Sequence, residues 1–337
     1  MSVAASPGQQ SAPRWRSRLR PPQRTGRRAR GTDRLIDALL HGLCGLAALI
    51  GVAVIAAIAY EVFSGASLSF SHFGLGFLVH TEWVPNFERF GAGVLLFGTV
   101  VSSAMALLLA IPLGVSIALY LSTVASGRVR RVIGPLVEML AAIPSVILGF
   151  WGILVLAPFL QAHLEPFLHG AFGFLPIFGV APTTGTGLFN AGLLLTIMVI
   201  PIIASISRDL FLTVPQELRD GAIALGATRW EVVRGVLLPS AGSGIVAASF
   251  LGLGRALGEA IAVAQVTGDG NLIKASLFAP GSTLASRIAQ EFVGAENKLT
   301  TSSLFYLGAI LLVIGLLANL AARLVVRRFN VHAAATR

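Results

Sequence analysis

Charged side chains are scarce in this 337-residue chain: 12% of its residues are Asp, Glu, Lys or Arg, whereas 55% are hydrophobic. Soluble domains carry about 25% charged residues, so the composition excludes a water-soluble domain. Cys44 is the only cysteine, which excludes a disulfide framework within the chain. A mean hydropathy of +0.81 indicates instead a protein embedded in a lipid bilayer.

Lysine is almost absent: the sequence contains only Lys274 and Lys298. A nucleotide-binding loop of the form Gly-x4-Gly-Lys-Ser/Thr requires a lysine beside the phosphates, and the chain has no such motif. The six histidines lack metal-ligand spacing, and no nucleophile–base pattern is present. We therefore predict a protein that is not an enzyme, with no metal site and no ATP site of its own.

Long apolar runs dominate what is present. Six of them reach the length of about 20 residues that an α-helix needs to cross a bilayer core, which predicts an all-α integral membrane protein. The first run is too long, and follows too basic a segment, to be a cleaved signal peptide. The predicted transmembrane helices are Leu35–Phe63, Gly93–Ser122, Val132–Leu160, Leu188–Thr213, Ala241–Thr267 and Ser302–Val326.

The distribution of basic residues predicts the orientation. With both termini in the cytosol, the cytosolic segments hold nine Lys and Arg in 1–34, three in 128–131, four in 208–234 and four from 323 onward. The outer segments then hold four, and one more, Arg255, lies within a helix. Such an excess on one side follows the positive-inside rule. We expect a multi-pass protein of the bacterial cytoplasmic membrane with N- and C-termini in the cytosol.

The ends of the chain differ in composition from the apolar part. We expect residues 1–34 to form a basic, disordered cytosolic tail, 35–328 the transmembrane domain and 329–337 a short cytosolic tail. The Arg-rich stretch in the first tail could bind nucleic acid, but no aromatic-rich RNA-binding pattern accompanies it. Attraction to anionic lipid is the better interpretation, and no nucleic-acid partner is predicted.

One pair of charges stands out in the fifth apolar run, in the sequence GLGRALGEA. Between 241 and 268 the only ionisable side chains are Arg255 and Glu259. A charge near the middle of a span costs about 2.5–3.5 kcal/mol on insertion scales. At a spacing of four residues the two would share a helix face and neutralise each other, and glycines 254 and 258 would let another helix approach. Arg255 could bind an oxyanion through two parallel hydrogen bonds; the alternative is an ion pair that only packs helices.

Two further residues have more than one interpretation. Trp83, in the outer segment 64–92, is expected at the depth of the lipid headgroups. Glu138 lies near the cytosolic end of the third predicted helix, where a packing role is as plausible as a gate.

The segment between the fourth and fifth predicted helices, residues 214–239, has the pattern of two short helices. The first runs over 216–225 and ends at Gly226, a residue that can adopt the left-handed conformation. The second begins after Thr228, and Glu231 three residues later completes a capping box. We expect Pro239 to turn the chain into the fifth span.

This segment resembles the EAA loop of ABC-importer permeases, whose pattern is Glu-Ala-Ala, three residues, Gly, nine residues, then Ile-x-Leu-Pro. Asp replaces Glu, Gly replaces the first Ala, and Val replaces Ile. In that family the loop forms a coupling helix that docks in a cleft on the ATPase subunit. The matching residues, to which the resemblance assigns coupling to an ATPase, are Asp220, Gly221, Ala222, Gly226, Val236, Leu238 and Pro239.

Other stretches resemble the membrane subunits of the phosphate-specific (Pst) importer, the C-type more than the A-type: LLAIPLGVSIALYLS, EMLAAIPSVILGFWG, GLGRALGEAIAV and ASLFAPGSTLASRIAQEFVGAE. The resemblance implies a type I ABC-importer permease fold and a pathway for inorganic phosphate that includes Arg255 and Glu259. It implies four kinds of partner: an A-type permease in a heterodimer, two ATPase subunits, an extracytoplasmic phosphate-binding protein and anionic lipid. ATP and Mg²⁺ would be bound by the ATPase subunits, and this chain would hold no cofactor.

Two alternatives remain within transport. The chain could be the permease for another oxyanion, such as sulfate or molybdate. It could also be a self-sufficient, ion-coupled secondary transporter, against which the coupling-loop pattern argues.

Overall fold

The computed structural model describes residues 29–179 and 184–335. The chain divides into two compact units, residues 1–58 and 59–337, each of which is described by itself. Most of the predicted basic tail lies outside the described residues. The described part of the first unit is a single helix that begins at residue 29 and continues into the second unit; this helix, α1, is Ala29–Gly65.

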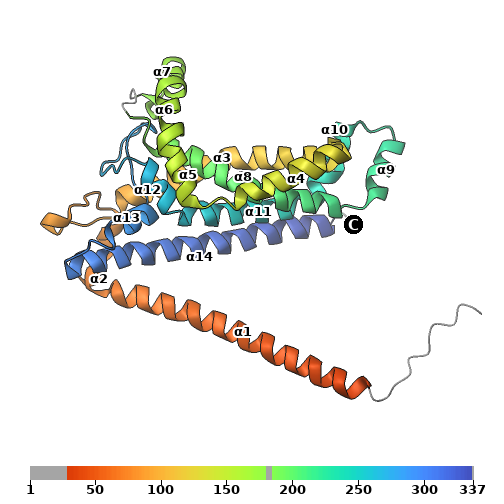
Figure 1. Ribbon diagram of the computed structural model, residues 1–337, viewed down its shortest axis with the longest axis horizontal. Helices are drawn as coiled ribbons and strands as arrows, with labels where there is room; N and C mark the ends of the chain where they lie inside the picture. Colours follow the sequence, from red (N-terminus) through yellow and green to blue (C-terminus); the bar gives the residue numbers. More distant parts are fainter. Residues whose placement is uncertain (1–28, 180–183, 336–337) are drawn as a thin grey trace, which may run out of the picture. The chain divides into compact units, whose positions relative to one another are not determined.

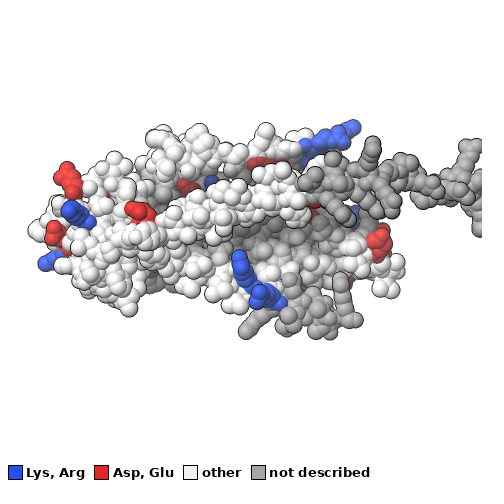
Figure 2. Space-filling model, turned by 90° about the horizontal axis from the view of Figure 1, so that it is seen from below, with Lys and Arg blue, Asp and Glu red and all other residues white. Residues whose placement is uncertain are grey.

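The number of membrane-spanning helices predicted from the sequence is confirmed. Six helices are long and apolar enough to cross a membrane, and the described residues form helices and connections with no strand beyond two isolated bridges. On the face shown in Figure 2, uncharged side chains cover most of the surface, as expected for a chain that contacts lipid. The candidate spans are Ile36–Gly65, Gly93–Val124, Ser145–Phe172, Leu188–Thr213, Arg229–Gly258 and Lys298–Arg327.

Helix α8 (Leu188–Thr213) occupies the centre of the second unit. Of its most apolar 18 residues, 67% are buried, more than in any other candidate span among the described residues. It packs most extensively against α3 (Gly93–Leu119), and α11 (Leu238–Gly258) packs on α8 and on α14 (Lys298–Ala335) (Figure 1). Small buried residues, such as Ala106 and Ala110 of α3 against Ala191 of α8, allow this close packing.

The third span does not lie where the sequence predicted it. The predicted helix Val132–Leu160 is interrupted, because α4 (Gly127–Ala141) ends before Pro144 and α5 (Ser145–Trp151) begins after it. Proline lacks an amide hydrogen and disfavours the helical conformation in the residue before it. The span therefore starts at the proline and runs to 172, while α4 packs along α8. The elements that continue it are π-helical Gly152–Leu156, α6 (Ala157–Phe159), π-helical Leu160–Leu164 and α7 (Glu165–Phe172).

The fifth span also differs from the prediction at both ends. Instead of starting at a turn at Pro239, it runs unbroken from α10 (Arg229–Val232) through a π-helical turn, Val233–Leu237, into α11. Pro239 cannot donate a backbone hydrogen bond, and a π-helical turn is one way for a helix to accommodate such a gap. At the other end α11 stops at Gly258, and a separate helix, α12 (Ile261–Val266), follows.

Shorter elements gather at the two ends of the spans in the second unit. In Figure 1, α9 (Gln216–Ala224) and α10 lie at one end, and α2 (Ser67–Phe73), α12 and α13 (Leu284–Glu291) lie at the other. The described remainder consists of short 3-10 turns at Gly74–Leu78, Pro85–Phe87 and Pro176–Phe178, the π-helical turn Tyr120–Val124, and loops.

Candidate functional site

Arg255 and Glu259 do not form the predicted ion pair. Arg255 lies in the last turn of α11, whereas Glu259 follows the helix end in an extended conformation with φ −73° and ψ 116°. The Glu259 carboxylate instead accepts a hydrogen bond from the Ala262 amide of α12 at 3.4 Å. Because the helix stops between them, the two residues do not share a helix face. The prediction of a self-neutralising pair is therefore wrong for this structure.

Each of these charges still complements the helix end beside it. A guanidinium at the end of α11 faces the negative end of that helix's dipole, and a carboxylate before α12 faces a positive one. Arg255 is exposed and makes no hydrogen bond or ion pair with any other described residue. The structure thus presents a cation without a partner at a break in the fifth span.

The glycines around Arg255 divide into two groups. A Cβ on Gly252 would lie 2.6 Å from Val199, so this glycine allows α11 to pack closely on α8. A Cβ on Gly254 or Gly258 would meet nothing within 4 Å in this chain. The two glycines that the sequence assigned to a helix-packing face therefore border open space beside Arg255.

The coupling-loop residues form a helix and a turn, as predicted. Asp220, Gly221 and Ala222 lie in α9, which ends just before Gly226. Gly226 has φ +89°, the left-handed conformation that terminates helices. The predicted capping box is also present: the Thr228 hydroxyl accepts from the Glu231 amide, and the Glu231 carboxylate accepts from the Thr228 amide.

Helix α9 and the residue after it carry two different faces. Leu218, Ala222 and Leu225 follow one another at helical spacing, and the two leucines are 53% and 91% exposed. The other face borders a cavity of about 900 Å³ with both apolar and polar walls. That face is formed by Gln216, Glu217, Arg219, Asp220 and Ile223. No residue of α9 is buried in this chain, so its apolar stripe lacks a partner here.

The other residues predicted to couple to an ATPase belong to the start of the fifth span. Val236 and Leu238 pack against a core cluster that includes Ala118 of α3 and Phe211 of α8. Pro239 is exposed, at the second position of α11. These residues therefore connect the coupling loop to the interior of the helical bundle.

Glu138 joins α4 to α8. Its carboxylate lies 2.8 Å from the Arg208 guanidinium, which also contacts Asp209 at 3.0 Å. A Cβ on Gly134 would lie 3.1 Å from Arg208, so the absence of a side chain there makes room for the guanidinium. The packing interpretation of Glu138 fits this geometry.

A buried ionic cluster at the opposite end of the unit was not predicted. Arg287 of α13 is 3% exposed and lies 2.8 Å from both Asp269 and Glu291. It also donates to Asn271 and to the Ser282 hydroxyl, and it thereby ties the loop 268–283 to α13. The spacing of Arg287 and Glu291 could have revealed half of this cluster. The other partners come together only when the loop folds back.

Trp83 belongs to the same end and is not an interfacial anchor. Its indole is 3% exposed, packs edge-on against Phe77 and Phe90, and donates to Glu291 at 2.8 Å. The indole is therefore inside the protein and does not face lipid. The hydrogen bond satisfies the one polar atom of a side chain that is otherwise part of the core.

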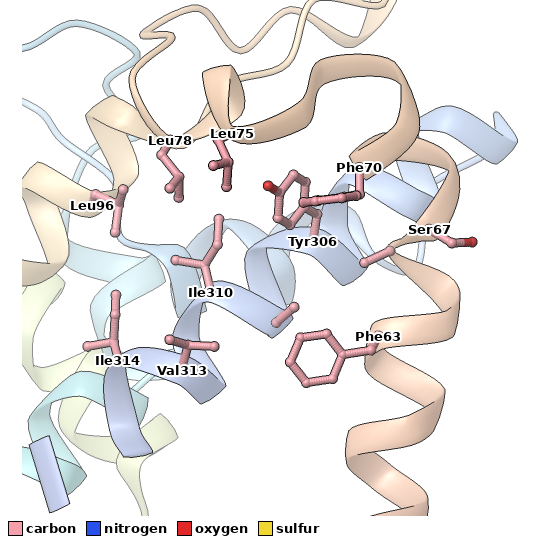
Figure 3. Close-up of a pocket in the computed structure, with 12 residues that line it drawn as sticks. Phe63, Ser67, Phe70, Leu75, Leu78, Leu96, Tyr306, Ile310, Val313 and Ile314 are labelled. Atoms are coloured by element: carbon pink, nitrogen blue, oxygen red, sulfur yellow. The ribbon is translucent and has the colours of Figure 1, made fainter. Parts of the chain in front are cut away.

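An apolar pocket of about 660 Å³ lies between the 59–65 end of α1, α2 and α14 (Figure 3). In Figure 3, Leu75 and Leu78 of the 3-10 turn Gly74–Leu78 and Ile310 of α14 point into it, and none of its lining residues is charged. A pocket of this chemistry suits apolar groups, so it is not the candidate pathway for an anion.

Together these features define a class of protein. Among the described residues, six apolar helices, a break in the fifth beside an unpartnered cation, and the exposed apolar stripe of α9 define a multi-pass membrane protein with surface open to partner chains.

Comparison with known proteins agrees with this class and narrows it. The model of the family of binding-protein-dependent transport system inner membrane components matches residues 110–331, and the chain belongs to this family. It is 42% identical over 243 residues to the phosphate transport system permease protein PstC of Mesorhizobium japonicum, covering 71% of this chain and 74% of the relative. The protein of the same name from Haemophilus influenzae is 43% identical over 237 residues, covering 69% and 75%.

A solved structure supports the fold. The chain aligns with a chain of the bacterial alginate ABC transporter, crystallised in complex with an alginate-pentasaccharide-bound periplasmic protein. The TM-score is 0.56 at 17% identity, and the alignment covers 88% of this chain and 97% of the other. The predicted permease fold of an ABC importer is thereby confirmed.

Proposed function

We propose that this chain is the permease subunit of an ATP-driven importer of inorganic phosphate and that it forms the pathway together with a second, A-type permease subunit. Relatives at 42–43% identity that bear the name of phosphate permeases support the substrate. The observation within the chain that carries the proposal is the exposed Arg255 beside a break in the fifth span.

Arg255 suits a transient anion contact for three reasons. It is the only basic side chain between 241 and 268, so a dianion in that region meets one cation there from this chain. Its planar guanidinium matches oxyanions through paired hydrogen bonds. It has no other partner among the described residues, so binding breaks no existing ion pair. Glu259 lies within the same break and weakens anion retention, as release from a transport site requires.

The open space beside two glycines of α11 supports the presence of a second permease chain next to Arg255. Gly254 and Gly258 leave space beside Arg255, and small residues are what close helix pairs in membranes use. A partner helix there would bury Arg255 between two subunits and away from lipid, where a charge is costly. This arrangement would make the pathway a property of the heterodimer.

The exposed stripe of α9 is the proposed contact with the ATPase subunits. Leu218 within α9 and Leu225 just after it expose apolar surface, and α9 has no buried residue. Such exposed apolar surface is unfavourable unless a partner covers it. ATP and Mg²⁺ belong to those partners. An extracytoplasmic phosphate-binding protein would deliver the substrate at the opposite end, near α13.

The proposed assembly implies an orientation, with α9 and both termini in the cytosol and anionic lipid beside the basic segments. Single cysteines in a Cys44→Ser background test it with a membrane-impermeant thiol reagent on intact cells. We expect labelling at position 297 and none at position 227. Labelling only at 227 would reverse the orientation.

The substrate is tested by reconstituting the chain with an A-type permease, the ATPase subunits and a phosphate-binding protein in vesicles. We expect ATP-dependent uptake of labelled phosphate that a tenfold excess of sulfate or molybdate does not reduce. Uptake that persists without the ATPase subunits would favour the ion-coupled alternative. Uptake of labelled sulfate or molybdate, with no phosphate uptake, would favour another oxyanion.

A further inference from the structure

Helix α9 is held to the rest of the second unit by few side-chain contacts. None of its residues is buried, and its apolar stripe points away from the cavity wall. Among the described residues, its one side-chain hydrogen bond to another element runs from the Arg219 guanidinium to the backbone carbonyl of Phe211 in α8. A single guanidinium thus bridges α9 and α8.

Phe211 is an effective anchor for that bridge. Its side chain is 0% exposed and belongs to the cluster that joins α8 to Ala118 of α3 and Ala241 of α11. A displacement of its carbonyl therefore moves a packed junction of three spanning helices, because tightly packed interiors transmit strain. α8 is also the most buried of the candidate spans, and it contacts α11, which carries Arg255.

The electrostatics favour this contact. Phe211 lies in the last turn of α8, where backbone carbonyls lack an intrahelical donor and carry partial negative charge. A guanidinium stabilises such a carbonyl better than a neutral donor does. Arg219 forms no ion pair among the described residues, although Glu217 and Asp220 line the same cavity. In the described part of the chain, the Phe211 carbonyl is thus the one hydrogen-bond partner of the Arg219 side chain.

We propose that Arg219 is a positioning residue that transmits movement of α9 to α8, and so links events at the ATPase to the pathway. This inference rests on the proposed function of α9 as the ATPase contact. It separates two tasks within one short helix: the leucine stripe binds the partner, and Arg219 passes the displacement on to the helical bundle.

The test compares Arg219→Gln with Arg219→Lys and with Arg229→Gln in the reconstituted complex. Arg229 lines the same cavity but makes no hydrogen bond or ion pair with another described residue, so it is the matched control. Three quantities are measured: ATPase subunit recovered with the permease, ATP hydrolysis with and without phosphate-loaded binding protein, and phosphate uptake.

We expect Arg219→Gln to retain the ATPase subunit and its unstimulated hydrolysis, while binding-protein stimulation and uptake fall by about tenfold, within the 5–150-fold range typical of coupling between sites. Arg219→Lys keeps a cation near the carbonyl, so its binding-protein stimulation and uptake should lie between those of Arg219→Gln and wild type. Arg229→Gln should match wild type.

Two results would overturn the inference. Wild-type stimulation in Arg219→Gln would show that the bridge transmits nothing. Loss of the ATPase subunit from Arg219→Gln would make Arg219 a docking residue instead. If the Arg219→Gln chain itself fails to fold in the membrane, Arg219→Lys decides: unchanged stimulation contradicts the inference, and reduced stimulation with the ATPase retained supports it. Failure of wild type to take up phosphate, with normal ATPase stimulation, would count against the proposed substrate alone.

Discussion

The two ends of the second unit are built in opposite ways. At the α13 end, which comprises α13 and the loop 268–283, Arg287 is buried and its partners lie within this chain. At the α9 end, which comprises residues 216–228, no helical residue is buried, and two leucines are largely exposed. The first end satisfies its buried charge within this chain. The second presents apolar surface that we assign to a partner protein.

The α13 end also shows closer packing. A Cβ on Gly98 of α3 would lie 2.1 Å from the Ser282 carbonyl, so the loop rests directly on that helix. Next to it, the Leu284 amide donates to the Thr99 hydroxyl at 2.9 Å. By contrast, a Cβ on Gly221 or Gly226 would meet nothing within 4 Å. Close packing is thus concentrated away from the proposed ATPase contact.

Removing the buried guanidinium of Arg287 should have the largest effect, because it destabilises the end that is held together within this chain. Arg287→Met leaves Asp269 and Glu291 without their cation, and loss of one partner from a buried pair costs about 3–5 kcal/mol. Asp269 is 58% exposed and can regain water, so we expect the lower part of that range. Thermal unfolding in detergent measures the effect. Arg89→Met is the control, because the pair between Arg89 and Glu82 is exposed and such pairs contribute about 0–1 kcal/mol. Equal melting temperatures for the two variants would contradict the account.

Placing a charge on the exposed stripe should affect assembly and leave the fold intact. Leu225→Asp is expected to weaken ATPase-subunit binding by about 30-fold, since a central interface residue typically contributes about 2 kcal/mol or more. Leu272→Asp is the matched control: Leu272 is 69% exposed but lies in the loop at the α13 end. A pull-down titration with the ATPase subunit measures both. Equal affinities would remove the stripe as a docking surface.

The turn after α9 should respond to a single methyl group. Gly226→Ala places a Cβ on a backbone with φ +89°, which costs about 1–2 kcal/mol. Since no atom lies near that Cβ, the effect is one of backbone strain alone. Hydrogen exchange of residues 216–232 should accelerate in this variant and should not accelerate in Gly221→Ala, where helix propensity favours alanine. Unchanged exchange in both would contradict the left-handed turn.

A smaller effect is expected from the indole at the α13 end. Trp83→Phe keeps the aromatic contacts with Phe77 and Phe90 but removes the hydrogen bond to Glu291. We expect a loss of about 1 kcal/mol, because Glu291 retains its ion pair with Arg287. Thermal unfolding of Trp83→Phe and Arg287→Met, measured side by side, checks that Arg287→Met lowers the melting temperature more. A Trp83 variant as unstable as the Arg287 variant would show that the indole bond, and not the ion pair, holds this end together.

The sequence predicted the features that depend on local chemistry. The six apolar runs, the left-handed Gly226 and the capping box of Thr228 and Glu231 follow from residue type and short spacing, and the structure confirms each. Arg255 was identified because a charge in an apolar run is costly wherever the helix ends lie.

Predictions that depend on tertiary packing were wrong. Hydropathy averaged over each run did not predict that the third and fifth helices break at Pro144 and Gly258, although a proline within a run is a local helix-breaking signal. The break after Gly258 lets α12 pack closely on α5, where a Cβ on Gly149 would lie 2.9 Å from Ala262. Trp83 was assigned to the lipid interface because its partner, Glu291, is 208 residues away. The buried cluster around Arg287 was missed for a similar reason, since it requires the folded loop.

Uptake of labelled phosphate by Arg255→Gln in the reconstituted complex tests the central claim most directly. Glutamine keeps a hydrogen-bonding side chain but removes the charge, and hydrogen bonds to charged groups contribute about 1.5–3 kcal/mol. Because a loss of about 1.5 kcal/mol corresponds to about a tenfold change, we expect uptake at least about tenfold below wild type. Assembly and unstimulated ATP hydrolysis should be retained. Because Arg255 and Glu259 form no ion pair, the double variant with Glu259→Gln should remain inactive. Wild-type uptake by Arg255→Gln or by the double variant would contradict a role for Arg255 in the phosphate pathway.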